Sequence, residues 1–103
     1  MFEFRRYKKK QGKSKKKHPK LIVDDNKDEY GFMSLTSRKQ KGKGHNNIKL
    51  VKNPQRNNSR NSYLRKKIEY DKKKKFTKVL NEFELSKEDK QFVIDFINKH
   101  KRR

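Results

Sequence analysis

Hydrophobic residues along the chain form short clusters separated by polar and basic stretches. Pro19 fixes its own φ and biases the preceding residue toward an extended conformation, so the apolar run 21–23 is expected to be a strand. The acidic and amide residues of 24–28 favour a turn, and alternating apolar positions resume over 29–36. The pattern therefore predicts a β-hairpin with an irregularity near Gly31.

Three further segments follow the hairpin. Residues 48–50 alternate between apolar and polar side chains and predict a short strand. The segment 62–70 alternates in the same way, with Lys66 interrupting its apolar face, and predicts a half-buried strand. Apolar residues spaced i, i+3, i+4 and i+7 over 76–83 predict a short helix. The outer face expected for the 62–70 strand carries Tyr63, Arg65, Lys67 and Glu69.

The C-terminal segment has the features of an amphipathic helix over about 86–100. Ser86 offers an N-capping hydroxyl, two acids follow in the first turn, and cations near the end suit the negative end of the helix dipole. The apolar stripe consists of Phe92, Val93, Phe96 and Ile97. Taken with the strands, this helix predicts a mainly β fold that ends in an α-helix.

Charge changes this picture at the N-terminus. The 103 residues include 33 Lys and Arg against 12 Asp and Glu, which gives a formal net charge of +21. We expect residues 1–17 to be a basic arm, disordered or ordered by a partner, and residues 18–103 to be a single domain. Such a charge predicts a polyanionic partner, and nucleic acid is the expected one. A solvated tail or a localisation patch would have a similar composition.

Several other classes of function find no support in the sequence. The chain has no Cys, and its three histidines lie too far apart for a zinc site, so we expect no metal and no cofactor. The longest apolar run, 21–23, is far shorter than the ~18 to 20 residues of a membrane helix, and the N-terminus lacks the apolar stretch of a signal peptide. The sequence therefore predicts a cytoplasmic protein with no membrane partner.

A basic surface with interleaved hydroxyl, imidazole and aromatic groups is the remaining candidate site. This mixture suits RNA, and a ribonuclease that uses the substrate 2′-hydroxyl as nucleophile needs no metal. It needs a group that exchanges a proton and cations or donors at the phosphate. By composition alone, basic surfaces that only bind outnumber those that cut. The residues expected to contact RNA are Lys20, Ser37, Arg38, Lys41, Lys43, His45, Ser62, Tyr63 and Lys67.

Five short motifs follow one another along the chain. They are His18-Pro19 before a strand, Thr36-Ser37 at a strand end, Ile48-Lys49-Leu50, Asn61-Ser62 opening a long strand that ends in Asp71-Lys72, and Leu85-Ser86 before the last helix. In this order they resemble the MazF/PemK (Kid) toxin family, over residues 18 to about 98. The family has Arg-Pro where this chain has His18-Pro19, and often an aspartate at the position of Asn61.

The resemblance implies a small SH3-like antiparallel barrel that forms homodimers, cuts single-stranded RNA without a metal and is neutralised by an acidic antitoxin. It places His18 at the family's catalytic arginine and Thr36 at its strand-end threonine. We expect Arg65 to be a supporting cation and the loop 37–47 to gate the groove. The basic arm indicates a diverged phage or plasmid branch.

The predicted function is therefore an RNA-binding, metal-independent endoribonuclease with His18, Thr36 and Arg65 as catalytic residues. Two alternatives stay open. One is a non-catalytic nucleic-acid-binding protein of a phage or plasmid, which could occupy the nucleic-acid channel of another protein. The other is a ribosome-associated basic protein, for which a lysine-rich arm is typical.

Overall fold

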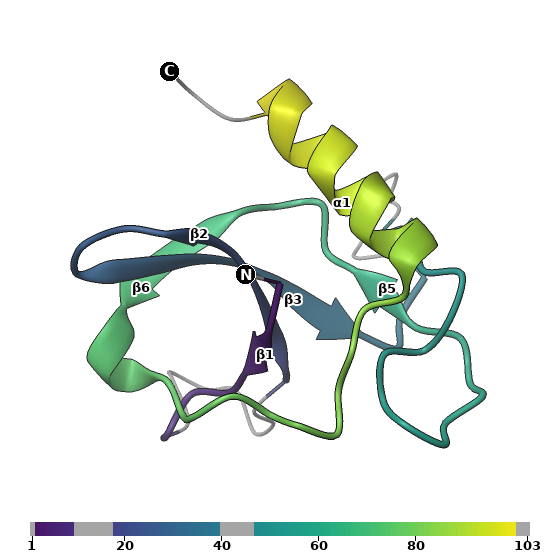
Figure 1. The fold of residues 1–103 in the computed structure, drawn as a ribbon, viewed down its shortest axis with the longest axis horizontal. Coiled ribbons are helices and arrows are strands. Elements are labelled where there is room, and N and C mark those ends of the chain that lie inside the picture. Colours follow the sequence, from purple (N-terminus) through teal and green to yellow (C-terminus); the bar gives the residue numbers. More distant parts are fainter. Residues whose placement is uncertain (1, 10–17, 40–46, 101–103) are drawn as a thin grey trace.

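The described residues fold into an antiparallel sheet with an α-helix near the C-terminus (Figure 1). The computed structural model describes residues 2–9, 18–39 and 47–100. The predicted mainly β fold with a C-terminal helix is confirmed. The elements are β1 (Phe4–Arg5), β2 (Lys20–Asp25), β3 (Glu29–Thr36), β4 (Ile48–Lys49), β5 (Tyr63–Leu64), β6 (Glu69–Lys72), the 3₁₀ turn η1 (Lys73–Lys75) and α1 (Lys87–His100).

β3 is the central strand of the sheet. The strand order is β1-β2-β3-β5-β4, and β6 pairs with the first half of β3 while β5 pairs with its end. Among the described residues β1 and β4 end this path without pairing with each other, so the sheet is not closed. Two isolated bridges, Tyr7 with Phe76 and Gln55 with Phe83, join segments outside the strands.

The predicted hairpin is present as β2 and β3, and it contains the expected irregularity. Ile22 pairs with Phe32 but Asp24 pairs with Gly31, so the register shifts between these two pairs. Gly31 lies under the Tyr70 ring, whose hydroxyl donates a 2.8 Å hydrogen bond to the Asp24 carboxylate. A Cβ at Gly31 would lie 2.7 Å from that ring and 2.8 Å from the Asp24 Cβ. The position therefore requires glycine because two neighbours approach its backbone closely.

The single strand predicted over 62–70 is divided into β5 and β6. Between them the Arg65 N–H donates to the Ser34 carbonyl at 3.0 Å, and the chain then makes a tight turn. An unbroken strand would place Lys66 on the same face as Leu64, which is fully buried. The turn leaves Lys66 exposed and keeps Leu64 in the core. Tyr63, which was expected on the outer face of the strand, is buried.

The short helix predicted over 76–83 is wrong. This segment is irregular and lies beside the N-terminal residues, and the Thr77 and Leu80 N–H groups donate 2.8 Å hydrogen bonds to the carbonyls of Arg6 and Phe4. Hydrogen bonds to a distant segment replace the local ones of a helix. The spacing of apolar residues was real, but it reflects burial of Phe76 and Phe83 in two different clusters.

The N-terminal residues belong to the domain, in contrast to the expected boundary at residue 18. Phe4 is fully buried in the main core, and β1 pairs with β2. The Lys8 N–H donates to the Lys75 carbonyl at 2.8 Å, which joins the N-terminal segment to η1 after β6. Residues 10–17 of the expected arm lie outside the described residues. Phe2 and Phe4 pack in the larger hydrophobic cluster and Tyr7 packs against the smaller one. The net charge of +21 gives no indication of these apolar contacts.

Two hydrophobic clusters hold these elements together. The larger includes Phe4, Leu21, Leu64 and Val93, and the smaller consists of Ile22, Phe32 and Phe76 with Tyr7 and Tyr30 packed against it. The helix α1 contributes Val93, and its Phe96 and Ile97 are partly buried. The described residues contain no helix long and apolar enough to cross a membrane.

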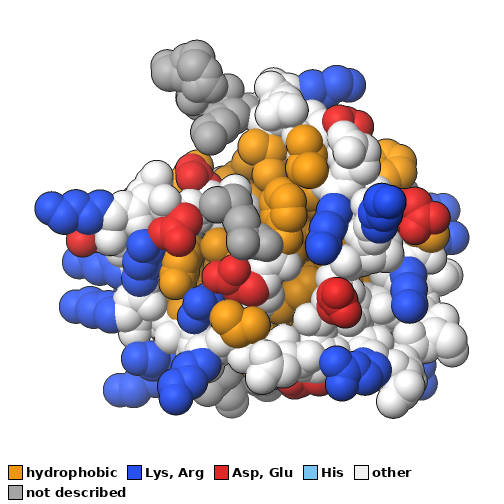
Figure 2. Space-filling model, in the orientation of Figure 1, with side chains coloured by type: hydrophobic (Ala, Val, Ile, Leu, Met, Phe, Trp, Pro, Cys, Tyr) orange, Lys and Arg blue, Asp and Glu red, His pale blue; other side chains and the backbone are white. Residues whose placement is uncertain are grey.

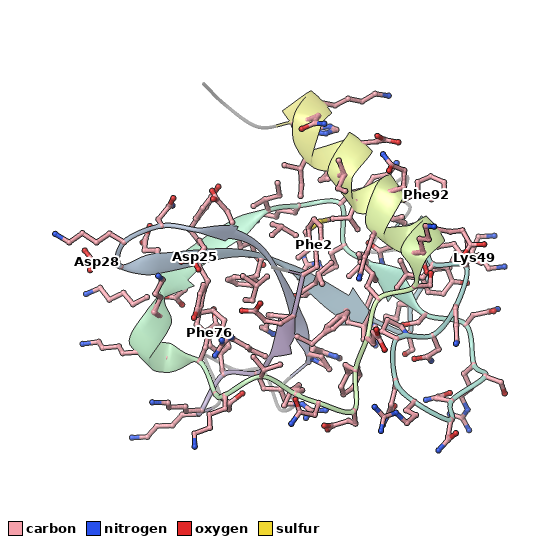
Figure 3. All side chains as sticks on the ribbon, viewed as in Figure 1. Phe2, Asp25, Asp28, Lys49, Phe76 and Phe92 are labelled. Carbon is pink, nitrogen blue, oxygen red and sulfur yellow. The ribbon has the colours of Figure 1, made fainter. Side chains whose placement is uncertain are left out.

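The expected apolar stripe of α1 is corrected at one position. Phe92 is 57% exposed, and Figure 3 shows its ring on the outer side of the helix, away from the sheet. The polar residue Asp89 takes a place in the core instead, one turn before fully buried Val93. The inward face of α1 is therefore rotated relative to the stripe that the spacing predicts.

Candidate nucleic-acid interface

The β2–β3 ladder brings the two principal candidate residues together. Lys20 pairs with Ser34, and the Leu35 N–H donates a 2.9 Å hydrogen bond to the Pro19 carbonyl, which continues the ladder beyond β2. The next positions in this register are His18 and Thr36. His18 is exposed and Thr36 is half-buried, so both can meet a ligand at this end of β3.

A third segment reaches the same place from β5. Thr36 pairs with Tyr63, and the Arg65 N–H donates to the Ser34 carbonyl at 3.0 Å. Arg65 is half-buried. His18, Thr36 and Arg65 thus come from three segments that converge at the end of β3, and we call this group the His18 site.

Lys20 lies beneath the His18 site. Its side chain is only 7% exposed, and its Nζ donates a 2.9 Å hydrogen bond to the His18 carbonyl. The ammonium lies 5.0 Å from the centre of the Tyr7 ring and 6.0 Å from that of Phe32. Cation–π attraction of this kind compensates part of the cost of burying the charge. Lys20 therefore supports the backbone of His18 from inside the fold.

Charge is crowded around Lys20. Burial lowers the pKa of its ammonium, the negative charge of Glu69 opposes this shift, and repulsion from Arg65 and Arg6 adds to it. The charged form of Lys20 is thus less favourable than in water. An anion bound beside Arg65 would relieve this repulsion, so the local electrostatics favour an anionic ligand.

Asp71 fixes the Tyr7 ring against which the Lys20 ammonium packs. The Tyr7 hydroxyl donates a 2.9 Å hydrogen bond to Asp71, and Lys75 lies 3.2 Å from the same carboxylate. Burial and the neighbouring carboxylate raise the pKa of Tyr7. Burial opposes ionisation of Asp71, but hydrogen bonds from the Lys72 backbone, Tyr7 and Lys75 together lower the pKa of its carboxyl. No local sequence pattern indicates these supporting roles, because Tyr7 and Asp71 lie 64 positions apart.

The segment after Thr36 is held where it leaves the sheet. The Arg38 N–H donates to the Thr36 Oγ1 at 3.2 Å, and the Asn47 side chain donates to the Arg38 carbonyl at 2.8 Å. The Asn47 N–H also donates to the Lys39 carbonyl. Ser37 and Arg38 are exposed near the His18 site. The remaining candidates of this loop, Lys41, Lys43 and His45, lie outside the described residues.

Three other predicted contact residues differ in their surroundings. Ser62 and Tyr63 are buried, at 5% and 8% exposure, so their side chains form part of the domain interior. Lys67 is exposed and lies 3.8 Å from the Glu69 carboxylate. Of these three, Lys67 has the charge and exposure to meet a phosphate.

The described part of the chain contains no group of three or more His, Cys, Asp or Glu residues that could hold a metal ion. What the His18 site offers is an imidazole, a hydroxyl and a guanidinium, with a buried ammonium beneath them. These groups can bind a phosphodiester and exchange a proton. Comparisons with protein-family models, with curated proteins and with solved structures find no match.

Proposed function

We propose that this protein binds single-stranded RNA and cleaves it without a metal, as an endoribonuclease of the MazF/PemK type. The observation that supports this proposal is the β2–β3 register, in which His18 and Thr36 occupy neighbouring positions at the end of the ladder. The sequence resemblance assigned these two residues separately, and Arg65 reaches the same end of β3. The net charge of +21 supplies the long-range attraction for a polyanion.

The proposed chemistry uses the RNA as its own nucleophile. The 2′-oxygen forms a bond to phosphorus, the bond to the 5′-oxygen breaks, and a proton passes from the first oxygen to the second. His18 is the group that exchanges this proton near neutral pH. The Arg65 guanidinium and the Thr36 hydroxyl stabilise the charge that develops on the phosphate oxygens. The products are a cyclic phosphate and a free 5′-hydroxyl.

The same proposal assigns the sheet to the SH3-like barrels of this family. Its support is that β3 pairs with β2 along one edge and with both β5 and β6 along the other. The bridge between Tyr7 and Phe76 further joins the N-terminal segment to the residues that follow β6. A homodimer and an acidic antitoxin partner belong to the same proposal.

Non-catalytic binding of nucleic acid is the second candidate function. It is favoured by the burial of Ser62, Tyr63 and Lys20, which leaves fewer side chains to surround a scissile phosphate. The exposed cations would still bind phosphates without positioning one for reaction. The two candidates differ only in whether the bound RNA is cut.

The decisive experiment incubates the full chain with mixed-sequence single-stranded RNA in EDTA. Cleavage that leaves a cyclic phosphate is expected, whereas DNA and 2′-O-methylated RNA should stay intact. His18→Ala should slow cleavage by ~10²-fold or more with little change in RNA affinity, and Thr36→Ala should act more mildly. His100→Ala is the matched control, because it removes an exposed imidazole from α1, away from the His18 site.

His18→Arg separates the two roles of His18, because arginine restores a permanent cation but does not exchange protons near neutral pH. Retained activity would assign His18 to charge stabilisation, and lost activity would assign it to proton transfer. RNA that is bound tightly but left intact would refute cleavage and favour the second candidate. Absence of RNA binding would refute the proposed function, and absence of DNA binding as well would refute the second candidate.

A further inference from the structure

A cleft of about 1240 Å³ lies between the 51–61 segment and residues 82–90, which include the start of α1. It is larger than the ~300–1,000 Å³ of typical small-molecule pockets, which suits a segment of a chain. Figure 1 places the 51–61 segment beside the first turn of α1 and far from the β2–β3 turn. The cleft shares no lining residue with the His18 site.

The walls of the cleft are held in place by backbone hydrogen bonds. The Arg56 N–H donates to the Glu82 carbonyl at 2.9 Å, and the Glu84 N–H donates to the Pro54 carbonyl at 2.8 Å. At the other end, the buried Asp89 carboxylate accepts the N–H groups of Val51 and Lys52. The two walls are therefore joined at both ends, so the cleft is formed before any ligand arrives.

The chemistry of the lining is polar and basic. Five of the lining side chains are cationic and three are carboxylates, and most of the others are amides or hydroxyls. Of the apolar lining residues, Leu50 and Leu85 are buried, whereas Val51 is 63% exposed. A single exposed apolar side chain offers little surface to an apolar helix or peptide, whereas a nucleotide finds cations for its phosphate and amides for its base and ribose. Figure 2 shows Lys and Arg side chains over this part of the face, mixed with carboxylates.

Four of the cations are not used by the fold. The side chains of Lys52, Arg60, Lys87 and Lys90 make no hydrogen bond or ion pair with any described residue. The start of α1 is not itself the anion site, because the Asp89 carboxylate already occupies its first turn. Glu84 and Glu88 are likewise exposed and without a side-chain partner among the described residues, so the charge available to a ligand is four positive against two negative side chains. Free cations around a preformed cleft have the chemistry of a phosphate-binding surface.

We infer that this cleft is a second binding site for single-stranded RNA, which holds a stretch of the strand outside the His18 site. The inference rests on the proposed function, because it assigns the cleft to the same RNA. A strand that occupies both places would be bound by two separated groups of cations. Its affinity would exceed that of either group alone, because the second contact becomes intramolecular.

The test measures the affinity of the full chain for fluorescent 2′-O-methylated single-stranded RNA, which is not cut, over a range of salt concentrations. The cleft variant is Lys52→Ala with Arg60→Ala. The control variant is Lys27→Ala with Lys74→Ala, which removes the same charge from the β2–β3 turn and η1. All four side chains are exposed and make no hydrogen bond or ion pair with a described residue, so both variants are expected to melt like wild type.

Each phosphate contact on a single strand contributes about 0.7 to the slope of log affinity against log salt, so the cleft variant should lower the slope by about 1.4. The control variant should leave it nearly unchanged. Equal slopes for the two variants, with wild type binding RNA, would overturn this inference and leave the proposed function standing. No binding by wild type would instead refute the proposed function.

Polyglutamate is the probe for the competing ligand class. If the cleft takes RNA, the cleft variant should lose affinity for RNA and bind polyglutamate as the control variant does. A loss of polyglutamate binding with no loss of RNA binding would assign the cleft to an acidic protein segment and overturn the inference.

Discussion

Asp89 is the residue whose replacement most directly tests how α1 is attached to the sheet. It is fully buried, and one carboxylate oxygen accepts the Val51 N–H at 2.8 Å. The other oxygen accepts the Lys52 N–H at 3.2 Å and the Ser86 hydroxyl at 2.9 Å. The Ser86 Oγ in turn accepts the Asp89 N–H, which completes a reciprocal helix cap. One side chain therefore caps α1 and holds the segment that follows β4.

Asp89→Asn keeps the shape of the side chain but removes one of its two accepting oxygens. One oxygen can still accept from one backbone N–H, while the new NH₂ group faces another donor. A buried donor left without an acceptor costs about 1 to 3 kcal/mol. Against a total stability of about 5 to 15 kcal/mol, this is a large fraction. Asp95→Asn is the matched control, because Asp95 is exposed on the same helix and the charge change is identical.

The assay is urea unfolding of the full chain. With a slope of about 1 to 3 kcal/mol per molar urea, a loss of 2 kcal/mol lowers the midpoint by about 1 M. Asp95→Asn should change the stability by less than about 0.5 kcal/mol. Ser86→Ala should cost about 1 kcal/mol, and its effect should not add to that of Asp89→Asn because the two share hydrogen bonds. Equal midpoints for Asp89→Asn and Asp95→Asn would refute the proposed attachment of α1.

Two further predictions concern the core and the pH dependence. Val93→Ala should lower the free energy of unfolding by roughly 2 kcal/mol, because it removes two buried methyl groups and leaves a cavity. Phe92→Ala should lower it by less than about 1 kcal/mol, because the Phe92 ring is exposed. Thermal melting that ranks the two variants in the opposite order would contradict the orientation of α1. The pKa of the Asp71 carboxyl is lower in the folded chain than its ordinary value of about 3.9. The ionised carboxylate therefore stabilises the fold at pH values above about 3.9, and this contribution is lost as the pH falls below that value. The stability gap between wild type and Asp71→Asn should therefore narrow from pH 6 to pH 3, and urea midpoints showing a gap that widens would contradict this.

Part of the candidate site could be predicted from the sequence. The hairpin was predicted from Pro19 and the turn at 24–28, and its register alone places His18 opposite Thr36. The inward position of Lys20 could not be predicted, because it depends on the Tyr7 and Phe32 rings, which approach from the segment after β1 and from β3. A local pattern can therefore indicate which residues are neighbours on one hairpin, but not which of their side chains face the interior.

The cleft had no counterpart in the sequence analysis. Its walls come from segments about 30 positions apart, and they are joined by Asp89 and by the bridge between Gln55 and Phe83. The sequence shows Asp89 as an acid in the first turn of a helix, which is the local half of its role. An acidic residue at the N3 position, one turn before Val93 on the inward face of the helix, is the signal that could have indicated a second partner.

The sequence by itself determined the elements whose hydrogen bonds are local: the hairpin with its irregularity at Gly31, and the C-terminal helix after Ser86. Turn residues and a capping hydroxyl act within a few positions, so their effect is readable along the chain. Tertiary structure decided the places where a distant segment offered better partners. Phe4 lies in the core instead of in a basic arm, and residues 76–83 form no helix because the Leu80 N–H bonds to the Phe4 carbonyl rather than within a helix. Such contacts join residues more than seventy positions apart, and no local pattern encodes them.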